Sequence, residues 1–415
     1  MSAVPECPVL DVTARSTHAE AAALRAKGPA VLVELPGPVH AWSVTRHRVI
    51  QALTNDPRVS RDARRHWPGL ADVPEGWSLA PFVLMRSFFN AYGEEHRVSR
   101  RRVTSSFSSR RVEAMRPQVQ ATADRLVEAL AALPPGATAD VRQDLALPLA
   151  ETVICDLFGV PDYQRAKLGA AIHAVLDPSV DAQRAMDILA ELQQRFTELL
   201  RYKREHPAGD LTGDLLSGED PLPEPVLLDT LFLMVGAGYE TSVNLITNAA
   251  GILLAHPGHL DRIRDGSIGW TDIVEETLRF DGPVMHLPLR FAVEDIDLGE
   301  GVVIRKGDPI IFAFAAAGRD PELHPDCPEH FDPARASKEH LAFGHGPHFC
   351  LGAHLGRLEA EVALTTLFTR LPDLALAHPG ERPARLPSFV ANTLASLEIV
   401  PHPTPLSATR AVVRR

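Results

Sequence analysis

The chain is poor in cysteine. Four cysteines occur in 415 residues, at positions 7, 155, 327 and 350, and no two of them form a C-x-x-C pair. This spacing excludes the dense disulfide framework of a small secreted domain and the paired cysteines of a structural zinc site. It is typical of a protein that remains in a reducing compartment, and we predict a cytoplasmic location.

Long apolar runs and an excess of positive charge are also missing. The most apolar run, residues 231–238, is far shorter than the roughly 18 residues that a membrane span requires. The first residues, MSAVPECPVL, lack the basic and apolar regions of a signal peptide, so we expect no membrane anchor. The formal net charge of −11 argues against a general affinity for nucleic acid, which requires a basic surface.

Hydrophobic periodicity predicts a mainly helical chain. Apolar residues recur at helical spacing in several long segments that end at Pro or Gly. The predicted helices cover residues 46–53, 112–133, 143–158, 163–175, 181–204, 225–255, 271–280 and 351–371. Strand-like runs occur at residues 31–35 and 41–44 and between residues 284 and 312. Segment 56–93 has little periodicity but many large apolar side chains, which favour an ordered lid over a solvated loop.

Cys350 lies where a loop rich in Gly, Pro and His leads into a predicted helix. Backbone N–H groups at a helix start lack intrahelical partners and carry partial positive charge, which stabilises a thiolate. Cys350 is therefore expected to be a nucleophile or a metal ligand. Gly344, Gly346 and Gly352 allow the backbone to approach a flat ligand closely. The alternative is a Gly-rich turn around a buried, inert cysteine.

Phe343, Gly346, Cys350 and Gly352 match the pattern F-x-x-G-x-x-x-C-x-G, which resembles the haem-binding signature of the cytochrome P450 family. His348 stands where that family often has a histidine. The resemblance implies haem b (iron protoporphyrin IX) with the thiolate of Cys350 as metal ligand. The residues that it assigns to cofactor binding are His96, Arg100, Ala237, Arg290, Phe343, Gly344, His348, Cys350 and Gly352.

Residues 94–111 form the one dense basic run in an acidic chain. His96 and Arg100 lie four residues apart, on one face of a predicted helix. The resemblance assigns both to the haem propionates, which need cationic or hydrogen-bonding partners once partly buried. The other arginines of the run are interpreted partly as a solvated face and partly as a docking surface for an acidic electron donor. The resemblance implies a ferredoxin-type donor with its reductase.

The longest helical pattern, residues 225–255, is apolar nearly all round and predicts a helix through the middle of the protein. Gly236 and Gly238 in its interior each cost about 0.8–1 kcal/mol relative to Ala, and a flat ligand against the backbone would compensate. The sequence A-G-x-E-T that ends at Thr241 is similar to the family's oxygen-activation signature. It implies that Glu240 and Thr241 are catalytic and relay protons. The alternatives are an exposed helix acid and a hydroxyl bonded to the preceding turn.

Two further sets of residues follow from the resemblance. Glu276 and Arg279 match the E-x-x-R structural ion pair; a solvent-exposed pair of this kind would contribute only a few tenths of a kcal/mol. His286 is a polar residue in a pocket that is otherwise commonly apolar, and a local hydrogen bond is a better interpretation than metal binding. The predicted substrate pocket is formed by Met85, Phe88, Leu233, Gly236, His286 and Val390.

We therefore predict a mainly α fold with a smaller β-rich portion, in a single domain of residues 1–415 with peripheral segments at 1–22 and 402–415. The resemblance implies the cytochrome P450 fold, a triangular helical domain with haem between the long central helix and the helix after Cys350. It implies a monomeric monooxygenase that uses dioxygen to hydroxylate or epoxidise a lipophilic steroid, macrolide or other secondary metabolite. The alternatives are a peroxide-driven P450 or one that catalyses coupling or rearrangement, and a non-enzymatic haem binder or gas sensor.

Overall fold

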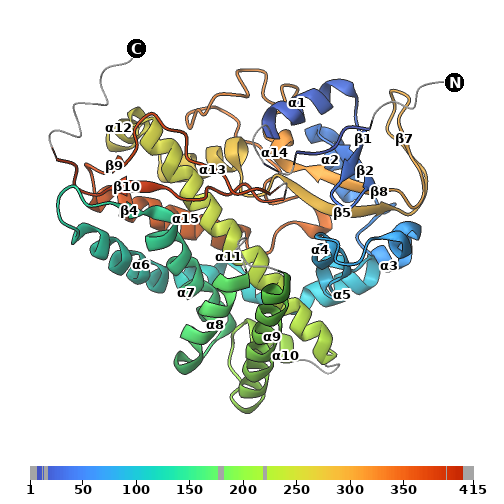
Figure 1. Ribbon diagram of the computed structural model, residues 1–415, viewed down its shortest axis with the longest axis horizontal. Coiled ribbons are helices and arrows are strands. Elements are labelled where there is room, and N and C mark those ends of the chain that lie inside the picture. The colour runs from blue at the N-terminus through green and yellow to red at the C-terminus, as the bar shows by residue number, and fades with distance from the viewer. Residues whose placement is uncertain are drawn as a thin grey trace.

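The longest helix of the chain, α11 (Glu224–Ala255), lies at its centre. The computed structural model describes residues 7–11, 13, 17–175, 182–217, 222–388 and 390–404, so most of the two segments predicted to be peripheral lies outside the described residues. Pro223 caps α11 and another proline occupies its first turn, where a missing N–H costs nothing. The helix crosses the middle of the molecule in Figure 1 and packs against α7, α13 and α15. Its length and composition would suit a membrane span, but its contacts make it a core helix.

The other helices of the helical portion surround α11 and share one large apolar core with it. They are α5 (Gly93–Thr104), α6 (Ser109–Ala131), α7 (Leu147–Phe158), α8 (Asp162–Val175), α9 (Ala182–Glu205), α10 (Leu211–Leu216), α12 (Gly258–Arg264), α13 (Trp270–Asp281) and α15 (Ala353–Arg370). α15 packs between α6 and α11. The segment that carries Cys350 therefore reaches the central helix.

The main sheet and the short helices lie on one side of the molecule, whereas the small sheet of β4, β9 and β10 lies on the opposite side (Figure 1). The main sheet has the order β1-β2-β8-β5-β3, in which only β2 and β8 are parallel neighbours. The strands of the main sheet are β1 (Val31–Leu35), β2 (Val39–Val44), β3 (Val59–Ser60), β5 (His286–Ala292) and β8 (Pro309–Ala313). A second sheet contains β4 (Ala139–Asp140), β9 (Ala375–Leu376) and β10 (Glu398–Val400). A third sheet contains β6 (Ile296–Asp297) and β7 (Val303–Ile304). The short helices are α1 (Thr17–Lys27), α2 (His47–Asn55), α3 (Ala63–His66), α4 (Ala80–Leu84) and α14 (Phe314–Ala317).

The predicted fold class, mainly α with a smaller β-rich portion, is confirmed. Each helix that periodicity predicted is present, with ends displaced by a few residues. The helix predicted to begin at residue 143 begins instead with a π-helical turn, Arg142–Ala146, that continues into α7. Segment 56–93 is ordered as predicted, but it contains α3 and α4, which are too short to give a periodic signal.

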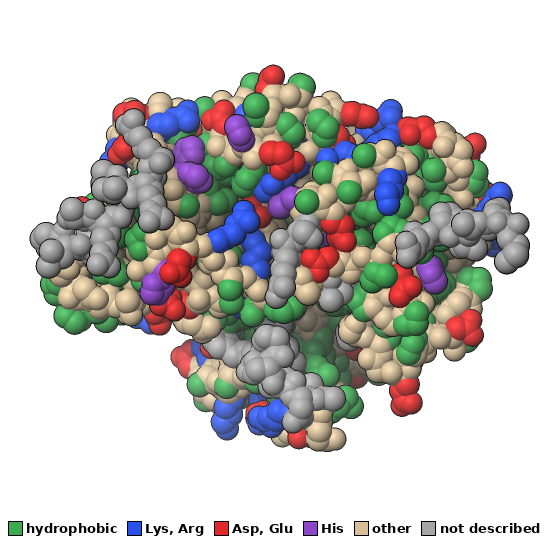
Figure 2. Space-filling model, turned by 45° about the horizontal axis from the view of Figure 1, so that its top comes forward, with side chains coloured by type: hydrophobic (Ala, Val, Ile, Leu, Met, Phe, Trp, Pro, Cys, Tyr) green, Lys and Arg blue, Asp and Glu red, His purple; other side chains and the backbone are tan. Residues whose placement is uncertain are grey.

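Charged side chains of both signs are mixed over the face shown in Figure 2, with apolar side chains between them. Such a mixture, on a chain with a net charge of −11, favours solubility.

Candidate functional site

Cys350 is held in a tight loop immediately before α15. Its N–H donates to the carbonyl oxygen of Phe343, 2.9 Å away. Gly344 and Gly346 have φ angles of +68° and +69°, a backbone conformation that residues with a side chain rarely adopt. A Cβ on Gly346 would also lie 2.6 Å from Oδ1 of Asn55, at the end of α2. The glycines of the sequence motif are therefore required by the shape of the loop and by its packing on α2.

The environment of the Cys350 thiol differs from the one that the sequence suggested. α15 begins at Ala353, so the cysteine precedes the helix by three residues. Burial raises the pKa of Cys350, and it outweighs the Gly352 N–H that donates to the sulfur and the nearby Arg100 and Arg357. Desolvation disfavours the charged form of an acid. A metal ion on the sulfur would supply the missing positive charge.

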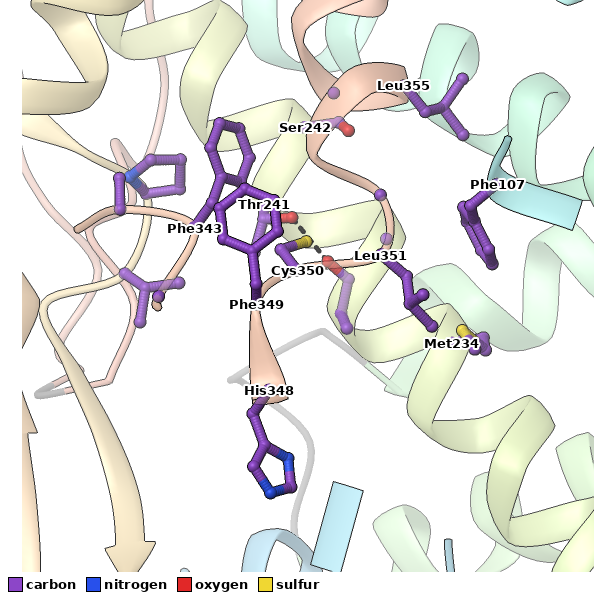
Figure 3. A pocket seen from close by; sticks show the side chains of 18 of the residues that line it. Phe107, Met234, Thr241, Ser242, Phe343, His348, Phe349, Cys350, Leu351 and Leu355 are labelled. Carbon is purple, nitrogen blue, oxygen red and sulfur yellow. Dashed lines mark hydrogen bonds between the residues drawn. The ribbon is translucent and has the colours of Figure 1, made fainter. Parts of the chain in front are cut away.

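The sulfur faces a large apolar cavity between α11 and α15 (Figure 3). About 1360 Å³ of this cavity, open solvent included, is free of protein atoms. Figure 3 shows Phe343 and Phe349 on one side of the sulfur and Leu351 and Met234 on the other. Thr241 of α11 lines the same cavity. The predicted functional residues that line the cavity are Arg100, Ala237, Thr241, Arg290, Phe343, Gly344, His348, Cys350 and Gly352. Segments far apart in the sequence thus meet around one thiol.

The predicted substrate residues divide into two groups. Phe88 and Leu233 line the cavity, whereas Met85, Gly236, His286 and Val390 do not. Successive side chains of a strand point to opposite faces, and on β5 it is Leu287, the residue after His286, that reaches the cavity. His286 is buried on the other side, with its backbone paired to β8. The backbone N–H of Met285, the residue before β5, donates to the Val390 carbonyl at 2.8 Å. Val390 therefore holds the start of β5 in place without lining the cavity.

The two predicted catalytic residues on α11 point in different directions. The Thr241 hydroxyl lines the cavity and donates to the carbonyl of Ala237, one turn earlier, at 2.5 Å. Glu240 does not line the cavity; its Oε1 accepts a hydrogen bond from the Thr393 hydroxyl at 3.4 Å. Burial raises the pKa of Glu240, and the nearby Arg142 opposes this rise. The carboxyl therefore lies behind the helix surface that carries Thr241.

The glycines of α11 serve two purposes. A Cβ on Gly238 would lie 2.9 Å from Cδ1 of Ile154, so this glycine allows α11 to pack closely on α7. No atom lies within 4 Å of the position that a Cβ on Gly236 would occupy. Ala237, between them, lines the cavity. A flat ligand against the helix therefore explains only part of this glycine-rich segment, and helix packing explains the rest.

A group of cationic and imidazole side chains gathers at one edge of the cavity. The rings of His96 and His348 lie 4.0 Å apart, and burial lowers the pKa of both, that of His96 to about 4. Arg290 is 4% exposed, and its Nη1 has no hydrogen-bond partner. Arg100 donates to the carbonyl of Phe349. These residues were predicted from the sequence, whereas Arg61, which is buried beside them, was not.

Iron protoporphyrin IX fits this arrangement of residues. A thiol faces the cavity, small and apolar residues of α11 form the opposite wall, and unsatisfied cationic donors lie at one edge. Buried donors without partners are costly, and the carboxylates of a porphyrin would satisfy them. The cavity, the thiol and the donors together therefore suit a flat, apolar metal complex with an anionic edge.

Glu276 and Arg279 form the predicted ion pair, with 2.7 Å between Oε1 and Nη2. Both side chains are fully buried, not exposed. Arg279 also donates to the carbonyl oxygens of Gly318, Pro328 and His330, which lie in the segment before the Cys350 loop. The pair thus connects α13 to the segment that leads to the cysteine.

A second acid of α13 supports the Cys350 loop directly. Glu275 accepts hydrogen bonds from His340 and Arg357, and these lower its pKa to about 2 although burial alone would raise it. The guanidinium of Arg357 lies 4.4 Å from the ring centre of Phe343. Glu275 thereby fixes the arginine that covers one wall of the cavity.

The chain is similar to proteins of one family. Residues 270–385 match the family model of cytochrome P450. The chain is 38% identical over 399 residues to 2-hydroxy-5-methyl-1-naphthoate 7-hydroxylase of Streptomyces carzinostaticus, covering 95% of this chain and 97% of that protein. It is 39% identical over 385 residues to cytochrome P450 monooxygenase PikC of Streptomyces venezuelae, covering 90% of each. The solved structure of CYP154A1 from Streptomyces coelicolor A3(2) has a TM-score of 0.89 and 44% identity, covering 95% of this chain and 100% of that one.

Identity at this level over nearly the whole chain agrees with the fold and with the residues around the thiol. Members of the family bind iron protoporphyrin IX through a cysteine thiolate, so the predicted haem cofactor is confirmed. The predicted class of enzyme is confirmed as well. The chain belongs to the cytochrome P450 family and is a haem-dependent monooxygenase.

Proposed function

We propose that this monooxygenase hydroxylates or epoxidises a lipophilic small molecule, such as a steroid, a macrolide or another secondary metabolite, with electrons from a ferredoxin-type donor. The observation that carries the substrate class is the wall of the cavity. This wall is mostly apolar, and its apolar residues from the lid segment, α11, β5 and the residues just before β5 include Phe88, Phe89, Leu233, Val284 and Leu287. The polar residues that α11 and β5 contribute to the lining are Thr241, Ser242 and Arg290. Pockets of this composition select ligands by shape and burial of apolar surface. The name of the naphthoate hydroxylase, an enzyme acting on an aromatic bicyclic molecule, supports the same class.

We assign the cofactor contacts as follows. The thiolate of Cys350 would hold the iron, and the cationic group that includes Arg100 and Arg290 would hold the propionates. When bound, the haem supplies the activation of dioxygen, favoured by electron donation from the thiolate. The protein excludes water from this region with Phe343 and Phe349 and orients the substrate against α11.

Thr241 and Glu240 share the handling of protons in this proposal. The Thr241 hydroxyl lines the cavity, as does the neighbouring Ser242, and in this proposal Thr241 delivers the proton. Glu240 is the second group of the relay in this proposal; burial raises its pKa, and its carboxylate accepts from the Thr393 hydroxyl. A conformational change or a water molecule links the two groups, since Glu240 itself does not line the cavity.

The electron donor docks, in this proposal, on the basic face beside the Cys350 loop. Arg100 contacts Phe349, which places α5 against that loop. Arg101 and Arg110, from the same basic run, are exposed. Arg111 is less available, because it pairs with Asp214. Complementary charge steers association with an acidic protein such as a ferredoxin.

The substrate class is tested by a spectral titration of the purified holoenzyme. The panel contains a steroid, a macrolide and a hydroxynaphthoate, with a small hydrophilic sugar as control. A lipophilic compound that displaces water from the site is expected to shift the Soret band to shorter wavelength, and the sugar to leave it unchanged. A response to none of the lipophilic compounds would contradict the proposed class.

Replacing Thr241 by Ala is expected to divert most of the consumed electrons to hydrogen peroxide, because the cavity loses its proton-delivering hydroxyl. The measurement is the ratio of peroxide to oxidised product at equal consumption of reduced donor. Thr247→Ala is the matched control, since the Thr247 hydroxyl also donates one turn back, to Val243, but is buried away from the cavity. Thr241→Ser should retain coupling. An unchanged ratio in Thr241→Ala would mean that the hydroxyl serves only the helix.

A further inference from the structure

Two arginines face each other across neighbouring strands at the edge of the haem cavity. β3 and β5 are antiparallel, and Ser60 pairs with Phe291. Continuing this antiparallel register by one residue places Arg61, just after β3, level with Arg290 on β5. Arg290 lines the cavity, and so does Phe89, whose ring centre lies 3.6 Å from the guanidinium carbon of Arg61. The pairing of the strands therefore brings two guanidinium groups to the same part of the cavity wall.

Both guanidinium groups are buried and incompletely bonded. Arg61 is 1% exposed; its Nη2 donates to the carbonyl of Pro288 at 3.1 Å, but its Nε and Nη1 have no partner. Arg290 is 4% exposed and packs over the ring of Phe312, with no partner for its Nη1. Within the part of the chain that the structure describes, neither arginine forms an ion pair with a carboxylate. Burial lowers the pKa of both, that of Arg290 to about 9.

The surroundings of the two arginines add no negative charge. The charged and titratable groups that act on Arg61, His96 and His348 are these groups themselves, Arg290 and Arg100, and none of them is an acid. Like charges opposite each other on adjacent strands destabilise a sheet, and buried charges without counterions cost several kcal/mol each. Such a pair persists in a fold when an anion lies between its members. Two guanidinium groups with free N–H donors suit a carboxylate, whose oxygens can accept hydrogen bonds from both groups.

We propose that Arg61 and Arg290 bind one carboxylate of the haem between them, which makes Arg61 a haem-binding residue that sequence reasoning did not identify. The proposal rests on haem binding in the cavity that Cys350 faces. It explains why an arginine without a protein counterion is fully buried beside β5. It also gives Arg61 an effect on the iron, because a nearby cation stabilises the more negative, reduced state of the haem and so raises its reduction potential.

The proposal is tested first by Arg61→Met in the holoenzyme. Haem transfer to excess apomyoglobin should become about tenfold to a hundredfold faster, as expected for the loss of charge-assisted hydrogen bonds. The midpoint potential of the iron should fall, and Arg61→Lys should restore the potential more fully than the haem retention. Arg65→Met is the control, because Arg65 is four residues away on α3 and its side chain is 58% exposed. Transfer rate and potential identical in Arg61→Met and wild type would overturn the proposal.

A second arm separates binding from a purely structural role of Arg61. Wild type and the Arg61→Lys and Arg61→Met variants are reconstituted with iron protoporphyrin IX dimethyl ester, which has no carboxylates. If Arg61 binds a propionate, esterification and substitution remove the same interaction, and their effects on haem release do not add. Additive effects would show that Arg61 only supports the fold. The reduced carbon monoxide spectrum, recorded for each sample, reports thiolate ligation separately, so its loss in wild type would contradict the role of Cys350 and not that of Arg61.

Discussion

Replacement of Cys350 by Ser is expected to abolish the far-red-shifted Soret band of the reduced carbon monoxide complex. That band requires a thiolate on the iron, and a serine hydroxyl is too weak an acid and too poor an electron donor to replace it. Monooxygenase activity should fall by more than the roughly 10–100-fold that loss of an outer-shell partner costs at a metal site. Carbon monoxide difference spectra of the reduced wild type and variant provide the measurement.

The control for this experiment is Cys327→Ser. Cys327 is an exposed, free thiol and does not line the cavity, so its replacement should leave the band unchanged. Cys155 is a less suitable control, because burial raises its pKa to about 12 and a serine in its apolar surroundings would destabilise the core. A shifted band of normal intensity in Cys350→Ser would show that another side chain binds the iron.

The parts of the site that the sequence predicted depend on local patterns. The glycines of the Cys350 loop mark positions where the backbone adopts a positive φ angle. The apolar pattern along the whole of α11 marks a buried helix. Both signals lie within one stretch of chain, so they are visible without knowledge of the fold. The haem-edge pair His96 and Arg100 is also local, because four residues make one helical turn.

The parts that the sequence did not predict depend on long-range pairing. Arg61 acquires its environment only because β3 pairs with β5, more than two hundred residues later. The orientation of His286 depends on the pleat of β5 and on a register shift between Leu287 and Arg290. The pKa of Cys350 depends on the desolvation imposed by the surrounding protein and on Arg100 and Arg357, of which Arg100 is distant in the sequence. Neither register nor burial is encoded in the few residues around each site.

Replacement of Glu276 by Ala is expected to lower the free energy of unfolding by about 3–5 kcal/mol, the usual cost of leaving a buried charge unpaired. Glu276 accepts from Arg279, Arg335 and the backbone N–H of Asp332, and its side chain is 0% exposed. Its loss leaves two arginines without their carboxylate, next to the segment that leads to Cys350. Urea denaturation, followed by helical circular dichroism and by the Soret band, should show haem loss at lower urea concentration.

The chain provides its own control for this prediction. Glu113 and Arg116 on α6 form an E-x-x-R pair with the same spacing, but their side chains are 46% and 41% exposed. Glu113→Ala should therefore leave the free energy of unfolding nearly unchanged, because solvent screens an exposed pair. Equal losses in the two variants would show that burial of the Glu276 pair is unimportant. Two identical sequence patterns are thus expected to differ severalfold in energy, because one lies under the Cys350 segment and the other lies in water.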